Sequence, residues 1–141
     1  MPSIAAYPSS TQERLTTRVS EIMSPGVITI GDHASLLHAK RAMVRHGVHA
    51  ILVLGAETGQ AIGWVSIDGL LSWLHRDLSA LPCVQAVTEP PHFIEPDATA
   101  RDALELLEKP GVSHLLVRAA RGGLPQGVVA PMDLVELVTR S

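Results

Sequence analysis

The sequence predicts a mixed α/β (α+β) protein made of two β-α-β-β-α repeats packed around a pseudo-two-fold axis. The first observation is that the chain of 141 residues matches itself over most of its length. The second is that each matching half alternates strand-like apolar runs with helix-periodic ones. The third is size, because a unit of about 60 residues buries too little apolar surface by itself and gains from packing on another.

A shift of 64 positions aligns the two halves, taking Ala39 to Ala103. The matching glycines mark backbone conformations that other residues resist. The best pairs are Ala39 with Ala103, Met43 with Leu107, Gly47 with Gly111, Gly63 with Gly127 and Leu70 with Leu134. Upstream, Val19 meets Val84, Pro25 meets Pro90 and Asp32 meets Asp97 with one extra residue, which we place in the turn around residues 33–34.

The first repeat begins with a β-branched run at residues 27–30, which predicts a strand. Asp32 or Ser35 then offers an oxygen for the N-cap of a helix that runs to about His46 and ends at Gly47. Strands follow at 50–54 and 61–66, around turn residues 55–59. A last helix starts near Asp68 and is expected to carry Leu70, Leu71 and Leu74.

The second repeat follows the same order. Asp97 or Thr99 caps a helix in which Ala100, Ala103, Leu104 and Leu107 have helical spacing. Strands are expected around 115–117 and 126–129, joined by a Gly-rich turn at 121–125, and the last helix spans 134–138. We therefore divide the chain into a flexible tail at 1–17, a first repeat at 18–76, a linker at 77–83 and a second repeat at 84–141.

Composition narrows the class of protein. Hydrophobic residues make up 46% of the chain, charged residues 18%, and the net charge is −3. There is no basic stripe for nucleic acid and no apolar run of the roughly 20 residues that cross a bilayer. The single cysteine, Cys83, suits the reducing cytoplasm, where we expect the protein. We expect no nucleic-acid or membrane partner.

The motifs in these repeats resemble the CBS domain, named for cystathionine beta-synthase, which occurs in tandem as the Bateman module. The resemblance rests on the opening segment at 19–23, on Ala39, Met43 and Gly47, and on the closing motif at 63–70 with its counterpart at 127–134. It spans about residues 18 to 139, and the chain resembles the stand-alone members of the family. The resemblance implies a regulatory sensor that dimerises and binds an adenosyl ligand, AMP, ADP, ATP or S-adenosylmethionine, in clefts between the repeats.

The family pattern also implies the ligand-binding positions. A carboxylate after the last strand accepts from both ribose hydroxyls, and this position holds Asp133 in the second repeat but Gly69 in the first. A hydroxyl three residues earlier donates to phosphate, and this position holds Ser66 in the first repeat but Ala130 in the second. Asp68 lies one residue before the carboxylate position, and a step of one residue along a helix turns the side chain by about 100°.

The phosphate positions that follow the helix-ending glycines hold His49 in the first repeat and Ser113 and His114 in the second. Each candidate also has a purely structural interpretation. Asp133, Asp68 and Ser66 are ordinary residues for a helix N-terminus, where a cap contributes about 0.5–2 kcal/mol. His49 and His114 are equally compatible with solvated strand ends.

Two functional interpretations stay open. The first is the homodimeric sensor, which passes its ligand state to an unidentified regulated protein and requires no cofactor. The second is a dimerisation or docking module whose nucleotide sites have degenerated, which the incomplete Ser/Thr-x-x-Asp motifs favour. We expect no enzyme, because no nucleophile elbow, phosphate loop or paired carboxylates occur. The seven histidines lack helical metal spacing, so no metal site is expected, although they could confer pH sensitivity.

Overall fold

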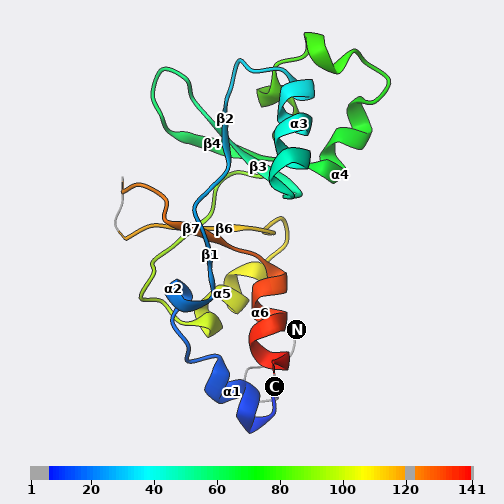
Figure 1. Cartoon of the computed structure of the whole chain (residues 1–141). Coiled ribbons are helices and arrows are strands. Elements are labelled where there is room, and N and C mark those ends of the chain that lie inside the picture. The colour runs from blue at the N-terminus through cyan, green and yellow to red at the C-terminus, as the bar shows by residue number, and fades with distance from the viewer. Residues whose placement is uncertain (1–6, 120–122, 141) are drawn as a thin grey trace. The chain divides into compact units, whose positions relative to one another are not determined.

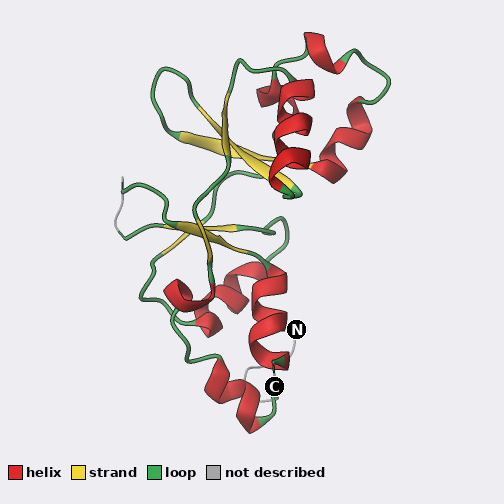
Figure 2. Ribbon diagram, in the orientation of Figure 1, coloured by secondary structure: helices red, strands yellow, loops and turns green. Residues whose placement is uncertain are grey.

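The computed structural model describes residues 7–119 and 123–140, which form two compact units (Figure 1). Unit 2 is the continuous segment Val27–Pro91, and unit 1 combines the described residues of Met1–Gly26 and His92–Ser141. Both units mix helices and strands, so the predicted α/β class is confirmed (Figure 2). None of the helices in the described ranges has the length and apolar character of a bilayer span.

Unit 2 has a three-stranded sheet in the order β2-β3-β4, with β2 parallel to β3 and β3 antiparallel to β4. Its α-helices and strands are β2 (Thr29–Gly31), α3 (Leu36–His46), β3 (Ala50–Leu54), β4 (Ala61–Ser66) and α4 (Ile67–Leu70). Three 3-10 turns complete it, η2 (Leu71–Trp73), η3 (Leu78–Ala80) and η4 (Cys83–Ala86).

Helix α3 begins and ends where its sequence signals lie. The Ser35 hydroxyl accepts the backbone N–H of His38 at 3.1 Å, which satisfies one of the free donors of the first turn. Asp32, the other predicted cap, instead accepts the N–H of Ala56 at 3.1 Å. Gly47 ends the helix in the left-handed conformation at φ 64°. Leu36, Ala39 and Met43 are fully buried on the sheet side.

Unit 1 has a four-stranded sheet in the order β1-β7-β6-β5. Its helices are α1 (Ser9–Arg14), α2 (Val19–Ile22), α5 (Ala100–Leu107) and α6 (Pro131–Thr139). Its strands are β1 (Ser24–Pro25), β5 (Phe93–Ile94), β6 (Leu115–Val117) and β7 (Gly127–Val129). Thr99, not Asp97, caps α5, because its hydroxyl accepts from Asp102 N–H while the Asp102 carboxylate accepts from Thr99 N–H at 3.0 Å.

Each unit includes the opening segment of the other repeat. In unit 1, Leu15 and Val19 join the core of the second repeat, and β1 pairs antiparallel with β7. In unit 2, Ala86 joins the core of the first repeat, where Trp64 N–H donates to Glu89 O at 2.9 Å. The compact units are therefore not the consecutive sequence repeats: the opening segment of each repeat completes the core that contains the other.

Two close approaches hold these exchanged segments. A Cβ placed on Gly127 would lie 2.5 Å from Ser24 O, and one on Gly63 would lie 2.5 Å from Glu89 O. Only glycine lets the backbones come this near. The equivalent glycines of the two repeats thus serve the same purpose.

The segment predicted as a flexible tail contains α1, and the predicted linker contains η3 and two buried side chains, Leu81 and Cys83. Arg14 of α1 donates to the carbonyls of Leu137 at 3.3 Å and Arg140 at 2.6 Å, so it caps the end of α6. The Cys83 thiol donates to Gly31 O at 3.2 Å, and burial raises its pKa to about 11.

The extra residue is not in the turn around residues 33–34, as the sequence comparison predicted. Strand β2 pairs Thr29 with Leu52, and β5 pairs Phe93 with Leu116, so both strands keep the shift of 64. Ala34 N–H donates to Gly31 O and Ala98 N–H to Glu95 O, again at that shift. Asp32 is therefore the counterpart of Pro96, and the match of Asp32 with Asp97 was wrong. The extra residue lies upstream, because Ser24 and Glu89 make equivalent strand contacts.

The last helix of each repeat also differs from prediction. Helix α6 starts at Pro131, three residues before the predicted start at 134, since proline is well suited to the first helical position. Helix α4 ends at Leu70, and the chain continues as η2. Of the three leucines expected in this helix, Leu70 lies in α4 and is buried, whereas Leu71 and Leu74 follow α4 and are 68% and 61% exposed. The turn at 121–125 lies partly outside the described residues.

Candidate functional site

The candidate site in unit 1 forms where β7 turns into α6. Val129 ends the strand, Ala130 is extended, and Asp133 is the third residue of the helix. Its carboxylate Oδ2 accepts the backbone N–H of Ala130 at 2.8 Å. Because Leu115 pairs with Val129 in the antiparallel sheet, Ser113 and His114 lie just before β6 at this same end of the sheet. Asp133, Ser113 and His114 therefore share one sheet end.

The Asp133 carboxylate is only partly exposed, and this sets its electrostatics. Burial raises the pKa of Asp133, the hydrogen bond from Ala130 N–H opposes that rise, and the nearby Glu136 carboxylate adds to it. One carboxylate oxygen is bound to the helix start. The second has acceptor capacity for a hydroxyl donor.

The Ser113 hydroxyl and the His114 ring form a polar pair at the strand end. Ser113 Oγ lies 2.8 Å from His114 Nδ1, and the tautomer of the imidazole decides which atom donates. Ser113 is exposed and His114 half-buried. This pair presents both a hydroxyl and an imidazole, groups that bind phosphate oxygens.

The equivalent turn of unit 2 uses different atoms. Ser66 caps α4, and its hydroxyl oxygen accepts the N–H of Gly69 at 2.9 Å. Ile67 N–H donates to His49 O at 2.8 Å, which ties the start of β3 to the helix start. Asp68 is exposed in the first turn, and Gly69 occupies the position that holds Asp133 in unit 1. The structure thus places Ser66 and His49 at one sheet end without a carboxylate at position 69.

Sequence reasoning missed a consequence of Pro131. A 64-residue shift takes Ile67 to Pro131 and His49 to Ser113, so the bond between Ile67 and His49 has no counterpart in unit 1 because proline lacks an N–H. The proline itself was visible in the sequence, but the bond that it removes is visible only once the strands are paired. Pro131 therefore makes no bond of this kind at the start of α6.

The ligand-binding roles assigned to Asp133, Ser66, His114, Ser113, His49 and Asp68 remain predictions. Within the described ranges, no group of three or more His, Cys, Asp and Glu side chains could hold a metal ion.

Two CBS-domain family matches cover residues 19–76 and 83–140. The fold is similar to that of the CBS domain of a bacterial CNNM/CorC family Mg²⁺ transporter in complex with ATP, at 25% identity and a TM-score of 0.78, covering 92% of each chain. Comparison with curated protein sequences gave no match.

Two further structures share the fold alone. A CBS-domain-containing protein from Agrobacterium tumefaciens has 19% identity and a TM-score of 0.74, with 87% of this chain and 94% of that one covered. Hypoxic Response Protein I with two coordinated zinc ions also has 19% identity, with a TM-score of 0.69 and coverage of 85% and 98%.

These findings define a tandem-repeat α/β module of the kind that is commonly regulatory and ligand-binding. The duplicated family match spans most of the chain, and the chain belongs to the CBS-domain family.

Proposed function

We propose that this protein is a regulatory sensor that binds an adenosyl ligand, an adenine nucleotide or S-adenosylmethionine, at the Asp133 end of unit 1. The observation that carries the proposal is the Asp133 carboxylate, which is partly buried at the start of a nine-residue helix with Ser113 and His114 at the same sheet end. The ATP complex of the similar CBS domain supports an adenine nucleotide as the ligand class.

Each group has a role in this proposal. Asp133 accepts from a ribose hydroxyl through the oxygen that Ala130 leaves free, and the Ser113 and His114 pair binds phosphate oxygens. The N-terminus of α6 adds a partial positive charge that favours anions. The protein does no chemistry on the ligand; it passes the bound state to a regulated partner. We further propose that it is a cytoplasmic homodimer.

A second candidate, a ligand-free dimerisation or docking module, is favoured by one observation in unit 2. There, the Ser66 hydroxyl is engaged as a helix cap, and Gly69 occupies the position where an aspartate would be needed to bind the ribose hydroxyls. If unit 1 also fails to bind, this second function replaces the first.

Thermal unfolding with millimolar AMP, ADP, ATP or S-adenosylmethionine tests the proposal. A ligand that binds only the folded state raises Tm, and at about 100 times Kd it adds about 2.7 kcal/mol. We expect one ligand to shift the wild type and to lose its effect in Asp133→Asn. Asp102→Asn is the matched control, because Asp102 has the same hydrogen-bonding role at the start of α5. No shift with any of the ligands contradicts the proposal.

A further inference from the structure

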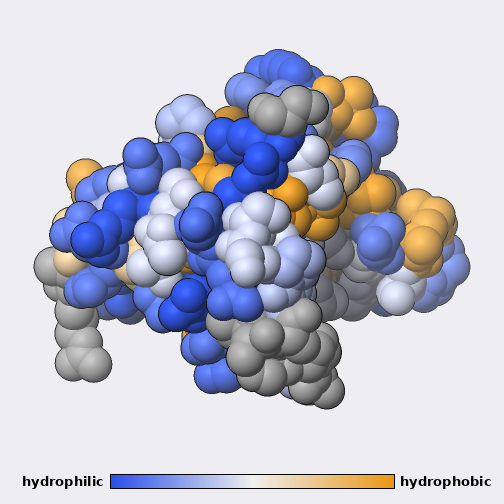
Figure 3. All heavy atoms as spheres, turned by 90° about the horizontal axis from the view of Figure 1, so that it is seen from below, coloured by the Kyte–Doolittle hydropathy of each residue, from blue (hydrophilic) through white to orange (hydrophobic). Residues whose placement is uncertain are grey.

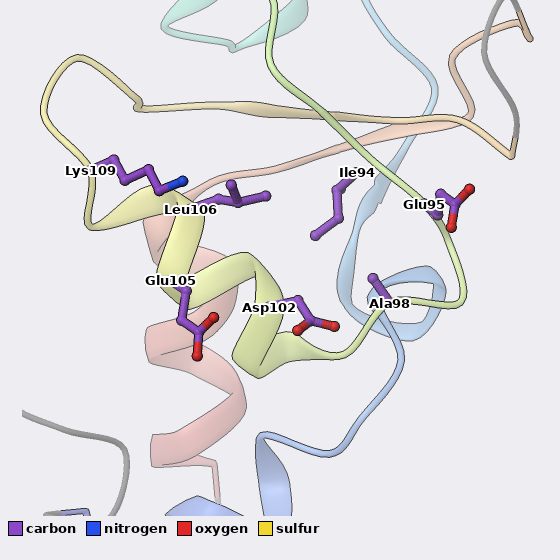
Figure 4. Close-up of a pocket in the computed structure, with 7 residues that line it drawn as sticks. All are labelled: Ile94, Glu95, Ala98, Asp102, Glu105, Leu106 and Lys109. Atoms are coloured by element: carbon purple, nitrogen blue, oxygen red, sulfur yellow. The ribbon is translucent and has the colours of Figure 1, made fainter.

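A groove beside α5 lies within unit 1 and outside the proposed ligand site. It has a volume of about 400 Å³ and is open to solvent. Figure 4 shows the side chains of Ile94 and Leu106 pointing toward one another between β5 and α5. All of the lining residues belong to unit 1, namely Ile94, Glu95, Ala98, Asp102, Glu105, Leu106 and Lys109.

The floor of this groove is apolar and belongs to the core of the unit. Ile94 is 7% exposed and is a member of that core, and Ala98 and Leu106 pack against it while keeping part of their surface in water. Because these side chains are held by the core, the floor is formed before anything binds to it. An incoming apolar side chain therefore only has to displace water.

The rim of the groove is acidic. Asp102 and Glu105 belong to α5, Glu95 directly follows β5, and all three side chains are exposed. Within residues 7–119 and 123–140, none of these carboxylates forms an ion pair. The lining residues contribute three carboxylates against the single ammonium of Lys109, which leaves the groove with a net charge of −2.

The equivalent positions of unit 2 do not form such a groove. Three of the lining positions change in chemical kind at a shift of 64, Asp102 to His38, Glu105 to Arg41 and Leu106 to Ala42. His38 and Arg41 are exposed, and Ala42 is buried with only a methyl group to offer. The acidic rim and the leucine are therefore features of unit 1 alone and do not follow from the fold that the two repeats share.

The size of the groove limits what can occupy it. A volume of about 400 Å³ is at the low end of the range for pockets that enclose a ligand, so the groove admits a few side chains and not a folded domain. Figure 3 shows apolar surface reaching solvent among polar patches on the face that it displays. Apolar surface rimmed by polar residues is typical of binding grooves.

We propose that this groove is the docking surface for a basic segment of a partner protein, in which an apolar side chain is flanked by arginine or lysine residues. The apolar side chain packs on the floor, and the flanking cations pair with the rim carboxylates. Charge complementarity selects this occupant, because a groove of net negative charge attracts cations and repels acidic segments. Arginine is favoured over lysine, since its guanidinium pairs with a carboxylate through two hydrogen bonds.

The inference adds the chemistry of the partner to the regulatory function proposed above, and it rests on that function for the existence of a regulated partner. The groove and the Asp133 site share no residue. Docking of the segment therefore does not need a bound adenosyl ligand, and the two sites can be tested separately.

Fluorescence anisotropy with the full chain and without nucleotide tests the docking. The probe is a fluorescein-labelled peptide whose central leucine has a pair of arginines on each side. We expect saturable binding to the wild type, weakened about 5-fold or more in Glu95→Gln with Glu105→Gln, because ion pairs at the rim are lost. Serine in place of the leucine of the peptide should weaken binding about 5-fold or more as well, because no apolar surface is then buried.

Glu13→Gln with Glu57→Gln is the matched control, because it removes the same charge from exposed positions outside the groove and should leave Kd unchanged. Circular dichroism confirms that each variant is folded. Absence of saturable binding to the wild type below about 1 mM peptide overturns the docking. Equal binding of the serine peptide overturns it too, as does a control variant that loses as much affinity as the groove variant.

A second copy of the chain is the competing occupant of the groove. If it fills the groove, the bound fraction of the peptide decreases at high protein concentration, and that result also overturns the proposal. Each of these outcomes leaves the thermal shift and its loss in Asp133→Asn unaffected, so failure of the docking and failure of the proposed ligand site are distinguishable.

Discussion

The turns that join the last strand to the last helix differ between the two units, although they occupy equivalent positions at a shift of 64 residues. In unit 2 the Ser66 hydroxyl caps α4 by accepting from Gly69 N–H, whereas in unit 1 the Asp133 carboxylate reaches back to Ala130 N–H. Ala130 replaces the serine, and Gly69 replaces the aspartate. Each unit keeps one half of the Ser/Thr-x-x-Asp motif and uses that half to satisfy the backbone.

Asp133 and Ser66 each stabilise the start of a helix, but they differ in the hydrogen-bonding capacity that remains for a ligand. Asp133 keeps an acceptor oxygen, which suits a ribose hydroxyl, while Ser66 keeps a proton to donate, which suits a phosphate. Since only unit 1 has the carboxylate, we expect it to be the unit that recognises the nucleoside. The predictions below test how far the units differ.

The largest expected effect concerns the core position shared by Met43 and Leu107. Met43 is fully buried in unit 2, while Leu107 is only partly buried in unit 1. Met43→Ala should lower the free energy of unfolding by about 3 kcal/mol, and Leu107→Ala by about half of that. Urea unfolding measures both. Equal losses would show that the two cores are packed alike.

The next effect concerns the glycines that hold the exchanged segments. Gly63→Ala and Gly127→Ala should each cost about 2 kcal/mol, because the new methyl group meets a backbone carbonyl that cannot move away alone. Gly31→Ala is the control, since its added Cβ has no neighbour within 4 Å. If the two glycine variants were as stable as the control, the exchange of opening segments would be contradicted.

A smaller effect concerns the helix caps. Ser66→Ala removes the acceptor for Gly69 N–H and should cost about 1 kcal/mol. Ala130→Ser offers α6 the hydroxyl that it lacks and should add roughly 0.5 kcal/mol, because Ala130 already has the extended backbone of a cap. Thermal unfolding of both variants measures the contrast, and destabilisation by Ala130→Ser would contradict it.

The smallest effect is the pH dependence contributed by Asp133. Burial raises its pKa in the folded state above the value in the unfolded chain. Its contribution to stability is therefore fully present below the unfolded pKa and is lost as pH rises through the folded pKa. We expect the stability of the wild type relative to Asp133→Asn, measured by urea unfolding, to fall as pH rises above the unfolded pKa of about 3.9. A constant or widening advantage would contradict the direction.

Much of the fold was predictable because its signals are local. Ser35 and Thr99 as caps and Gly47 as the end of α3 follow from the geometry of single turns. The exposure of Leu71 and the early start of α6 at Pro131 were not predicted, because helical spacing alone does not say which faces find a partner. The exchange of opening segments depends on long-range pairing of β1 with β7, for which the sequence offers no local signal.

The candidate site was predictable only in part. The motif located Asp133 and Ser66, and the strand pairing then brought Ser113 and His114 to the Asp133 end. The sequence offered the helix-terminus role of Ser66 and Asp133 only as one of two interpretations, since a hydroxyl or carboxylate near a helix start suits a cap and a ligand equally well. The hydrogen bonds of both side chains confirm that structural role.

Calorimetric titration of the purified chain with the ligand that gives the largest thermal shift tests the central claim most directly. We predict one adenosyl site per chain, weakened by at least about 10-fold in Asp133→Asn and unchanged in Asp102→Asn, because loss of a charge-assisted hydrogen bond costs roughly 1.5–3 kcal/mol. Two equal sites per chain, or one site that survives Asp133→Asn and is lost in Ser66→Ala, would contradict the assignment of nucleoside recognition to unit 1.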